Sequence, residues 1–179
     1  MIDTGRLILR AWRDSDREPF FAMSQDPEVM TYLGPLATSR ADSDPGVDRM
    51  MALQAARGHC FWAIERKGDG AFIGFCGLKI CNDPCPVADE VEIGWRLRRD
   101  AWGQGYAREA AAASLAWGWA NLDAPRIIAM TAMSNRRSWG LMERLGMTRR
   151  ADLDFDHPRL AIGDPLRRHI VYTIDRPET

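Results

Sequence analysis

The chain has 179 residues, of which 46% are hydrophobic and 27% charged, and its formal net charge is −1. This length and composition suit one α/β domain with a full core, so we expect residues 1–179 to form a single domain. The balanced charge argues against nucleic-acid binding. No apolar run approaches the ~20 residues of a membrane span, and the first residues do not resemble a signal peptide. A cytoplasmic enzyme is therefore expected.

Hydrophobic periodicity and turn residues predict about seven strands and four helices. In chain order these are a strand over 7–12, a helix from Asp14 or Ser15 to about Asp26, a helix over 47–56 entered through 43–45, strands over 61–65, 72–78 and 90–97, a helix over 107–122, a strand over 126–131, a helix over 135–145, and closing strands over 147–155 and 168–174. This order indicates a mixed α/β (α+β) fold with a mostly antiparallel sheet.

The strand over 90–97 alternates cleanly between apolar and polar residues. Val91, Ile93, Trp95 and Leu97 share one face, and Glu90, Glu92, Gly94 and Arg96 share the other. A glycine inside a strand is costly unless a bulge or a closely approaching ligand uses it, so Gly94 indicates one of these. The polar face is a candidate for catalytic side chains.

A glycine-rich turn follows this strand and opens the next helix. Gly103 and Gly105 lack the Cβ atoms that would keep a ligand away, and the free N–H groups of a helix N-terminus bind phosphate. No Lys follows Gly105, which excludes a Walker loop, and Arg108 replaces the third glycine of a dinucleotide fingerprint. The alternative is a strand-to-helix turn without a ligand.

Three segments together resemble the GNAT superfamily of N-acetyltransferases, and within it the ribosomal-protein N-terminal acetyltransferases. They are residues 4–10, residues 92–95 followed by 102–110, and residues 135–147. The resemblance covers nearly the whole chain. It implies a GNAT-like fold with a splayed central strand pair, acetyl-CoA as co-substrate, and direct acetyl transfer to a primary amine, such as a protein N-terminal α-amine.

The resemblance also implies which residues hold acetyl-CoA. They are Trp95, Arg96, Leu97, Arg98, Arg99, Gly103, Gln104, Gly105, Tyr106, Ala107, Asn135 and Ser138. The amides of residues 103–107 would bind the pyrophosphate, and the backbone of residues 95–97 would pair with the pantetheine arm. Asn135 would contact the ligand, cap its helix, or do both, and Ser138 would lie near the sulfur.

Two positions depart from the pattern of the superfamily. Asp100 stands where Gln or Arg is common, so we expect it to point away from the ligand or to cap the turn. Met142 replaces the tyrosine that serves as general acid in many members. A thiol with a pKa of about 8.5 leaves near neutral pH with little acid assistance, so this loss is tolerable.

The amine must lose a proton before it attacks the thioester. Glu92 is the predicted base, acting directly or through water, with Glu90 as the alternative; each is otherwise a salt-bridge partner, for instance of Arg96. Ser138 is expected to donate a hydrogen bond to the sulfur, so the catalytic candidates are Glu92 and Ser138. The resemblance implies that the acceptor binds between residues 26–57 and the loop before the last strand, where Tyr32, Trp12 and the acidic stretch 152–157 are candidates.

No metal site is predicted. Cys60 and Cys76 lie in strand-like runs, and only Cys81 and Cys85 share a loop, where a metal or disulfide role is a minor alternative. Two functional alternatives stay open: acetylation of a small amine such as an antibiotic, polyamine or amino acid, and acetyl-CoA binding without catalysis. A homodimer is also left open.

Overall fold

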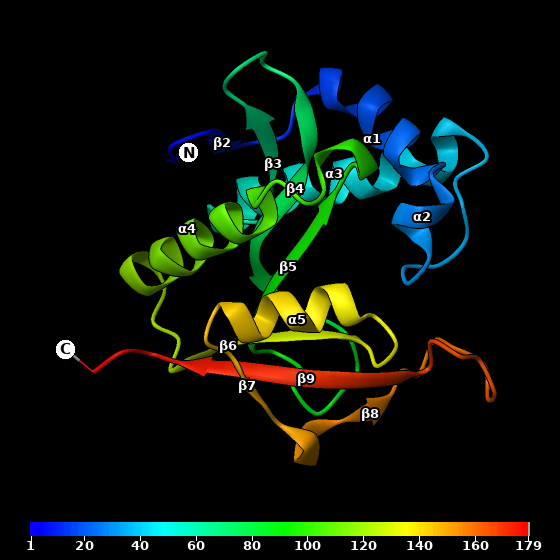
Figure 1. Ribbon diagram of the computed structural model, residues 1–179, viewed down its shortest axis with the longest axis vertical. Coiled ribbons are helices and arrows are strands. Elements are labelled where there is room, and N and C mark those ends of the chain that lie inside the picture. The colour runs from blue at the N-terminus through cyan, green and yellow to red at the C-terminus, as the bar shows by residue number, and fades with distance from the viewer. Residues whose placement is uncertain (179) are drawn as a thin grey trace.

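The computed structural model describes residues 1–178, which form one mixed β-sheet with helices on both faces (Figure 1). The strands are β1 (Ile2–Asp3), β2 (Leu7–Arg10), β3 (Phe61–Arg66), β4 (Phe72–Ile80), β5 (Val91–Leu97), β6 (Arg126–Ala132), β7 (Thr148–Arg149), β8 (Phe155–Asp156) and β9 (Arg168–Asp175). The helices are α1 (Arg17–Ser24), α2 (Pro27–Met30), α3 (Arg40–Arg57), α4 (Tyr106–Asn121) and α5 (Arg136–Arg144), with short 3-10 turns η1 (Asp14–Asp16), η2 (Arg99–Ala101) and η3 (Ala151–Leu153). The predicted fold class is confirmed.

The sheet divides at its centre. Its strand order is β1-β2-β3-β4-β5-β6-β9-β7, with β8 on β9, and β5–β6 is the parallel pair among antiparallel neighbours of the described chain. This pair is joined only at Val91–Ile127 and Glu92–Ile128, although β5 continues to Leu97 and β6 to Ala132. The two strands diverge beyond Glu92, as Figure 1 shows, which confirms the expected splay.

Different helices cover the two faces of the sheet. Phe75 on β4 packs near Phe20 of α1, with ring centroids 6.3 Å apart, and the next residue, Cys76, contacts Ser114 of α4. Because neighbouring residues of a strand point to opposite faces, α1 and α4 lie on opposite sides. The approach of α4 depends on Gly118, where an added Cβ would lie 2.5 Å from Leu78 Cδ1.

Gly94 is explained by side-chain packing rather than by a bulge. It pairs in regular register with Gly77, and a Cβ added to Gly94 would lie 2.6 Å from the ring of Phe61. Phe61 in turn stacks on Phe75 with ring centroids 5.8 Å apart. Of the two alternatives for Gly94, the bulge is therefore excluded, because the register is regular and an aromatic ring occupies the space above it.

The helix predicted over 47–56 begins earlier, at Arg40. Ser39 and Asp42 form a capping box, and the Asp42 carboxylate accepts from the N–H groups of Thr38 and Ser39 at 2.8 and 2.9 Å. Pro45 lies inside the helix, so treating it as the entry was wrong. The predicted C-terminus is confirmed, since Gly58 ends the helix with φ 74°.

Two other boundaries also differ from expectation. The strand predicted over 147–155 is broken into β7, η3 and β8, because the Asp154 carboxylate accepts from Arg149 at 2.6 Å and from the N–H of Val171 at 3.2 Å. The short helix α2 was not predicted; Asp26 caps it by accepting from the Glu28 N–H at 2.9 Å. Among residues 1–178, no helix has the length and apolar character that crossing a membrane requires.

Candidate active site

A cleft of about 1010 Å³ opens where β5 diverges from β6. Its walls come from α2 and the residues that follow it, the end of β5, the start of α4, and α5 over its whole length. The predicted ligand residues that line it are Trp95, Arg96, Leu97, Arg99, Gly103, Gly105, Tyr106, Ala107, Asn135 and Ser138. The splay thus brings together three stretches of chain that lie far apart in the sequence.

The glycine turn has the backbone that its sequence predicts. Gly103 and Gly105 adopt left-handed conformations with φ 75° and 81°, which other residues adopt only with strain. Gly105 immediately precedes α4, and no side chain caps that helix. The first N–H groups of α4, at Tyr106 and Ala107, have no partner within the helix and border the cleft, so the site can receive an anion.

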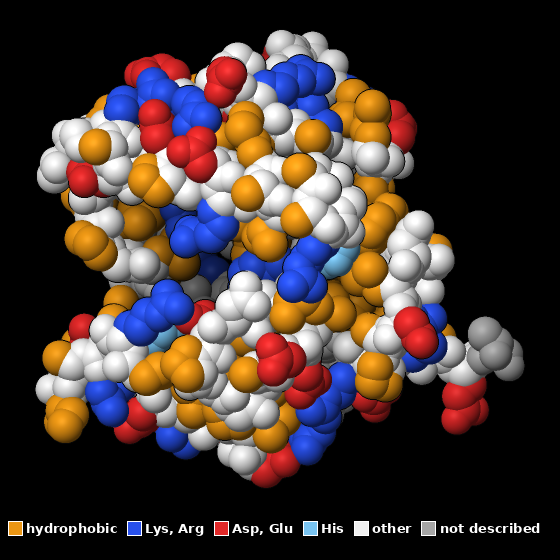
Figure 2. All heavy atoms as spheres, turned by 180° about the vertical axis from the view of Figure 1, so that it is seen from behind, with side chains coloured by type: hydrophobic (Ala, Val, Ile, Leu, Met, Phe, Trp, Pro, Cys, Tyr) orange, Lys and Arg blue, Asp and Glu red, His pale blue; other side chains and the backbone are white. Residues whose placement is uncertain are grey.

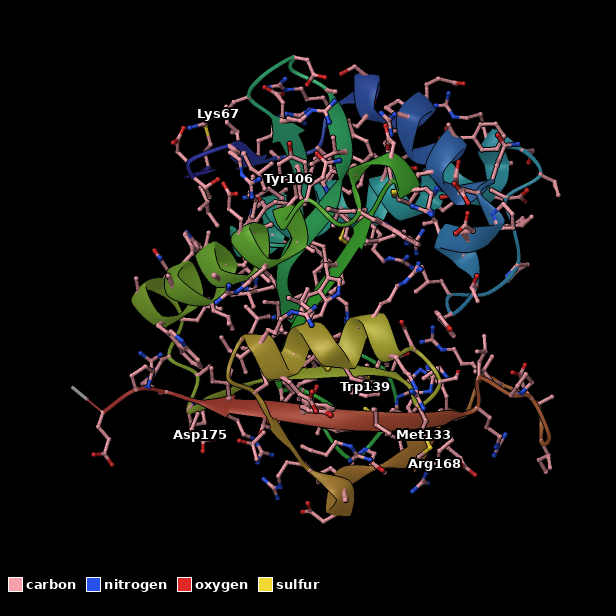
Figure 3. The ribbon with its side chains drawn as sticks, viewed as in Figure 1. Lys67, Tyr106, Met133, Trp139, Arg168 and Asp175 are labelled. Carbon is pink, nitrogen blue, oxygen red and sulfur yellow. The ribbon has the colours of Figure 1, made fainter. Side chains whose placement is uncertain are left out.

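An arginine from the N-terminal segment holds this turn in place. Arg6 Nη1 donates to the carbonyl of Gln104 at 2.9 Å, and its Nε donates to the Glu109 carboxylate at 2.7 Å. The Arg6 guanidinium also lies 4.6 Å from the ring centroid of Tyr106, which Figure 3 shows at the start of α4. Sequence reasoning missed this role, because no local pattern links Arg6 to a turn about a hundred residues away.

The cleft is strongly basic although the chain is nearly neutral. The arginines among its described lining residues are Arg96, Arg99, Arg108, Arg136, Arg137 and Arg144, whereas the acidic one is Glu28. Arg99 and Arg137 both lie against the ring of Trp102, at 5.0 and 4.7 Å from its centroid. From behind, Lys and Arg side chains also gather around a hollow across the middle of the molecule (Figure 2). Such a lining favours a polyanionic ligand.

Arg98 and Gln104 do not line the cleft, unlike the other predicted ligand residues. Arg98 donates to the Asp100 carboxylate at 2.8 Å and to the carbonyl of Phe72 at 3.1 Å. Gln104 donates through its side chain to the carbonyl of Asp100 at 2.8 Å. Arg98 therefore neutralises the charge of Asp100 outside the lining of the cleft. This pairing explains how an acidic residue is tolerated beside an anion-binding turn.

Asn135 occupies the helix-cap position that its sequence context favours. Its Oδ1 accepts from the Ser138 N–H at 3.3 Å, and its Nδ2 donates to Thr131 Oγ1 at 3.0 Å. This cap fixes the start of α5 and leaves Ser138 half-buried on the cleft wall. Met142, in contrast, is 1% exposed and packs in the core, so its position offers no proton donor to the cleft.

Glu92 lies at the last paired position before the splay. It forms an ion pair with Lys79 on the neighbouring strand β4, not with Arg96 as one alternative held. Burial raises the pKa of Glu92 above its ordinary value, and the charge of Lys79 opposes that shift. The side chain is not part of the cleft lining, so a base at this position would act through a bridging water.

The alternative base, Glu90, is held by Arg126. Both carboxylate oxygens of Glu90 accept from the Arg126 guanidinium, at 2.6 and 2.5 Å. This bidentate pair is the structural role expected of a strand-edge carboxylate. Glu90 is therefore a weaker candidate for proton transfer than Glu92.

Of the residues predicted to contact the acceptor, only Tyr32 is among the described residues that line the cleft. Tyr32 lines the cleft, whereas Trp12 is buried in the core and donates to the Phe61 carbonyl at 2.6 Å. In the acidic stretch, Asp152 and Asp154 pair with neighbouring arginines outside the cleft lining. The four cysteines are free, with Cys81 and Cys85 Sγ atoms 3.6 Å apart, and residues 1–178 contain no group of three or more metal-ligating side chains.

Known proteins share this sequence pattern and this fold. A GNAT acetyltransferase domain matches residues 6–148. The Bacillus subtilis (strain 168) protein YkkB is 32% identical over 147 residues, which cover 80% of this chain and 83% of YkkB. The domain match over residues 6–148 includes β2, the glycine turn and α5.

Solved structures agree over almost the full length. A GNAT-family acetyltransferase from Bacillus anthracis superimposes with a TM-score of 0.79 at 24% identity, covering 99% of both chains. The ribosomal L7/L12 alpha-N-protein acetyltransferase RimL, solved in complex with coenzyme A, superimposes with a TM-score of 0.77 at 18% identity, covering 96% of this chain and 95% of RimL. At these identities the likeness shows the fold alone.

Proposed function

Because the chain belongs to the GNAT acetyltransferase family, we propose that it transfers acetyl from acetyl-CoA to the α-amino group of an acceptor, such as a protein N-terminus. The observation that supports this most is the left-handed Gly103–Gly105 turn, which opens the start of α4 into the cleft. Unpaired N–H groups there fit a pyrophosphate, and the surrounding arginines fit its charge. The residues present therefore suit CoA.

The diverging edge of β5 offers a binding surface for the pantetheine arm of acetyl-CoA. Beyond Glu92, the backbone groups of β5 that face β6 have no strand partner among residues 1–178. An extended pantetheine arm would add to this edge like a strand and direct the thioester toward the vertex of the splay. Ser138, on the opposite wall, would donate a hydrogen bond to the departing sulfur.

Proton removal completes the transfer. An α-amine has a pKa of about 7.7–8.0, so its deprotonation near neutral pH costs only about 1 kcal/mol, whereas a lysine amine costs several times more. Glu92 would take this proton through water. The nitrogen then bonds to the acetyl carbon, and the carbon–sulfur bond breaks to release CoA as thiolate or thiol.

The acceptor is tested directly by a panel of amines. We expect peptides with free Ser or Ala termini to release CoA thiol and to gain one acetyl group, as measured by thiol titration and mass spectrometry. If small amines are acetylated in preference to peptides, the acceptor is a small molecule and not a protein N-terminus. If acetyl-CoA binds but no amine causes thiol release, the chain is a non-catalytic acetyl-CoA-binding module.

Removing the charge of Lys79 is expected to shift the pH dependence of turnover. Burial raises the pKa of Glu92 and Lys79 lowers it, so Lys79→Met should raise that pKa further. Glu92 works as a base only when ionised, so the acidic limb of the kcat profile should move to higher pH. Lys67→Met, which removes an exposed lysine paired with Asp3, is the control. An unmoved limb in Lys79→Met would contradict a role for Glu92.

Arg6→Ala is expected to weaken CoA binding by about tenfold, the effect of losing one charged hydrogen bond. The variant frees the Gln104 carbonyl and removes the guanidinium from the Glu109 carboxylate, so the glycine turn loses its support. Calorimetric Kd values for CoA measure the change. Arg13→Ala removes an arginine that pairs with Glu65 instead, and it should leave the Kd unaltered. Equal Kd values for both variants would show that Arg6 does not position the turn.

A further inference from the structure

A second cavity of about 540 Å³ adjoins the cleft and shares Arg96 with it. Its walls come from α1, the segment between α2 and α3, and the first half of α3. The residues that matter here are Phe20, Met30, Leu36, Asp42, Arg49 and Arg96. This volume lies within the range of small-ligand sites. Because Arg96 lies on the diverging part of β5 and lines both spaces, a group bound to it would border the cleft.

The Arg96 guanidinium has no anionic partner among residues 1–178. Its Nε is buried without any hydrogen bond, and the structure shows neither an ion pair nor a side-chain hydrogen bond for this residue. Its contacts are aromatic: the guanidinium carbon lies 5.3 Å from the ring centroid of Phe75 and 5.8 Å from that of Phe20. Burial lowers the pKa of Arg96 to about 10, so it remains charged at neutral pH.

Arg10 shows how this fold normally treats a buried arginine. Its side chain is 7% exposed, and it pairs with Asp16 at 2.8 Å and with Glu65 at 2.7 Å. Two carboxylates thus compensate one buried cation. Arg96 is half-buried and has no such compensation among residues 1–178, so its guanidinium donors indicate a place for a ligand.

The rest of the cavity adds a second cation and one carboxylate. Arg49 lines it from α3 and lies close enough to lower the pKa of Arg96 by charge repulsion. Asp42 also lines it, but its Oδ2 accepts from the backbone N–H and the hydroxyl of both Thr38 and Ser39. That carboxylate is committed to the cap of α3. The described lining thus carries two arginines and one carboxylate, so its net charge is positive.

We propose that Arg96 and Arg49 bind a carboxylate of the acceptor, so that the enzyme acetylates an amine carrying a carboxylate a few bonds away. This inference rests on the proposed function and narrows its substrate class. A carboxylate offers lone pairs that two guanidinium groups can fill, and it would relieve the repulsion between them. A polyamine would instead bring further positive charge against both arginines. Free amino acids and peptides with an acidic residue near the N-terminus share the required chemistry.

Matched acceptors test the carboxylate. We would compare free amino acids with their amides, and peptides that begin Ser-Asp with peptides that begin Ser-Asn, with spermidine as a cationic reference. The carboxylate member of at least one pair should show kcat/KM higher by about tenfold or more, the effect of a charged hydrogen bond. The pair that shows this difference identifies whether the bound carboxylate belongs to a free amino acid or to an acidic residue of a peptide. Equal use of both members, or a preference for spermidine, would overturn the inference.

Arg49→Gln tests the cavity, since Arg49 is outside the lining of the cleft. It should raise the KM of the carboxylate acceptor about tenfold and leave the KM of acetyl-CoA and the use of the amide unchanged. Arg57→Gln, at the exposed end of the same helix, is the matched control. An unchanged carboxylate preference in Arg49→Gln would overturn the inference.

The two proposals fail in different ways. Acetyl transfer without a carboxylate preference would defeat only this inference, whereas no transfer to any amine would defeat the proposed function. Calorimetry with CoA present compares Kd for the carboxylate and its amide without turnover. If the wild type binds the carboxylate more tightly than the amide and Arg49→Gln loses this difference, the carboxylate site is supported even when no acetyl transfer is seen. Equal Kd values for the carboxylate and the amide in the wild type would contradict the site.

Discussion

Replacing Glu92 with Gln is expected to lower kcat by about 10²–10⁴-fold, the contribution typical of a general base. The substitution removes the only group at the vertex of the splay that we assign to proton removal, while the amide oxygen can still accept from Lys79. The fold should therefore persist, and CoA binding should change little. Steady-state kinetics with a peptide acceptor, together with the calorimetric Kd for CoA, separates turnover from binding.

Glu90→Gln is the matched control for that variant. Glu90 lies two residues earlier, and both its oxygens are held by Arg126. Its loss should affect stability more than turnover. A kcat that falls in Glu90→Gln but not in Glu92→Gln would reverse the assignment of the base, and an unchanged kcat in both would remove these carboxylates from the mechanism.

Asp16→Ala should destabilise the fold by about 3–5 kcal/mol, the usual cost of breaking a buried ion pair from one side. The side chains of Arg10 and Asp16 are 7% and 3% exposed, and both carboxylate oxygens accept from Arg10 at 2.8 Å. Asp16 also accepts from the Arg13 N–H at 2.8 Å. Its removal leaves Arg10 with Glu65 alone and frees the turn that leads into α1. Urea titration gives the free energy of unfolding.

Asp14→Ala is the control, because Asp14 lies in the same turn but its side chain is 88% exposed and pairs with Arg17. It should cost much less, since exposed pairs are screened by water. Similar losses for both variants would show that burial of the Arg10–Asp16 pair is not what stabilises this region.

Local patterns were sufficient to predict the parts of the site that depend on local backbone. Gly103 and Gly105 take the left-handed conformations that a phosphate-binding turn needs, and alternation along 90–97 predicted β5 nearly to the residue. Asn135 caps α5 as its residue type suggests. In each case the physical cause lies within a few residues of sequence, so the sequence is enough.

The rest depends on contacts between distant segments. Lys79 meets Glu92 only through the register of β4 and β5, and Arg6 reaches the Gln104 carbonyl across the fold. The basic lining of the cleft is hidden by a net charge of −1, because acidic residues elsewhere in the chain cancel it. Local signals can also mislead: Pro45 suggested a helix entry that the Ser39 cap had already supplied.

The central claim is that this cleft transfers acetyl from acetyl-CoA to an amine. It is tested most directly by measuring CoA thiol and acetylated product together, in one reaction with acetyl-CoA and a mixture of peptide and small-molecule amines. We predict acceptor-dependent thiol release, matched one for one by new amide. Stabilisation of the protein by acetyl-CoA with no thiol release from any amine would contradict the claim.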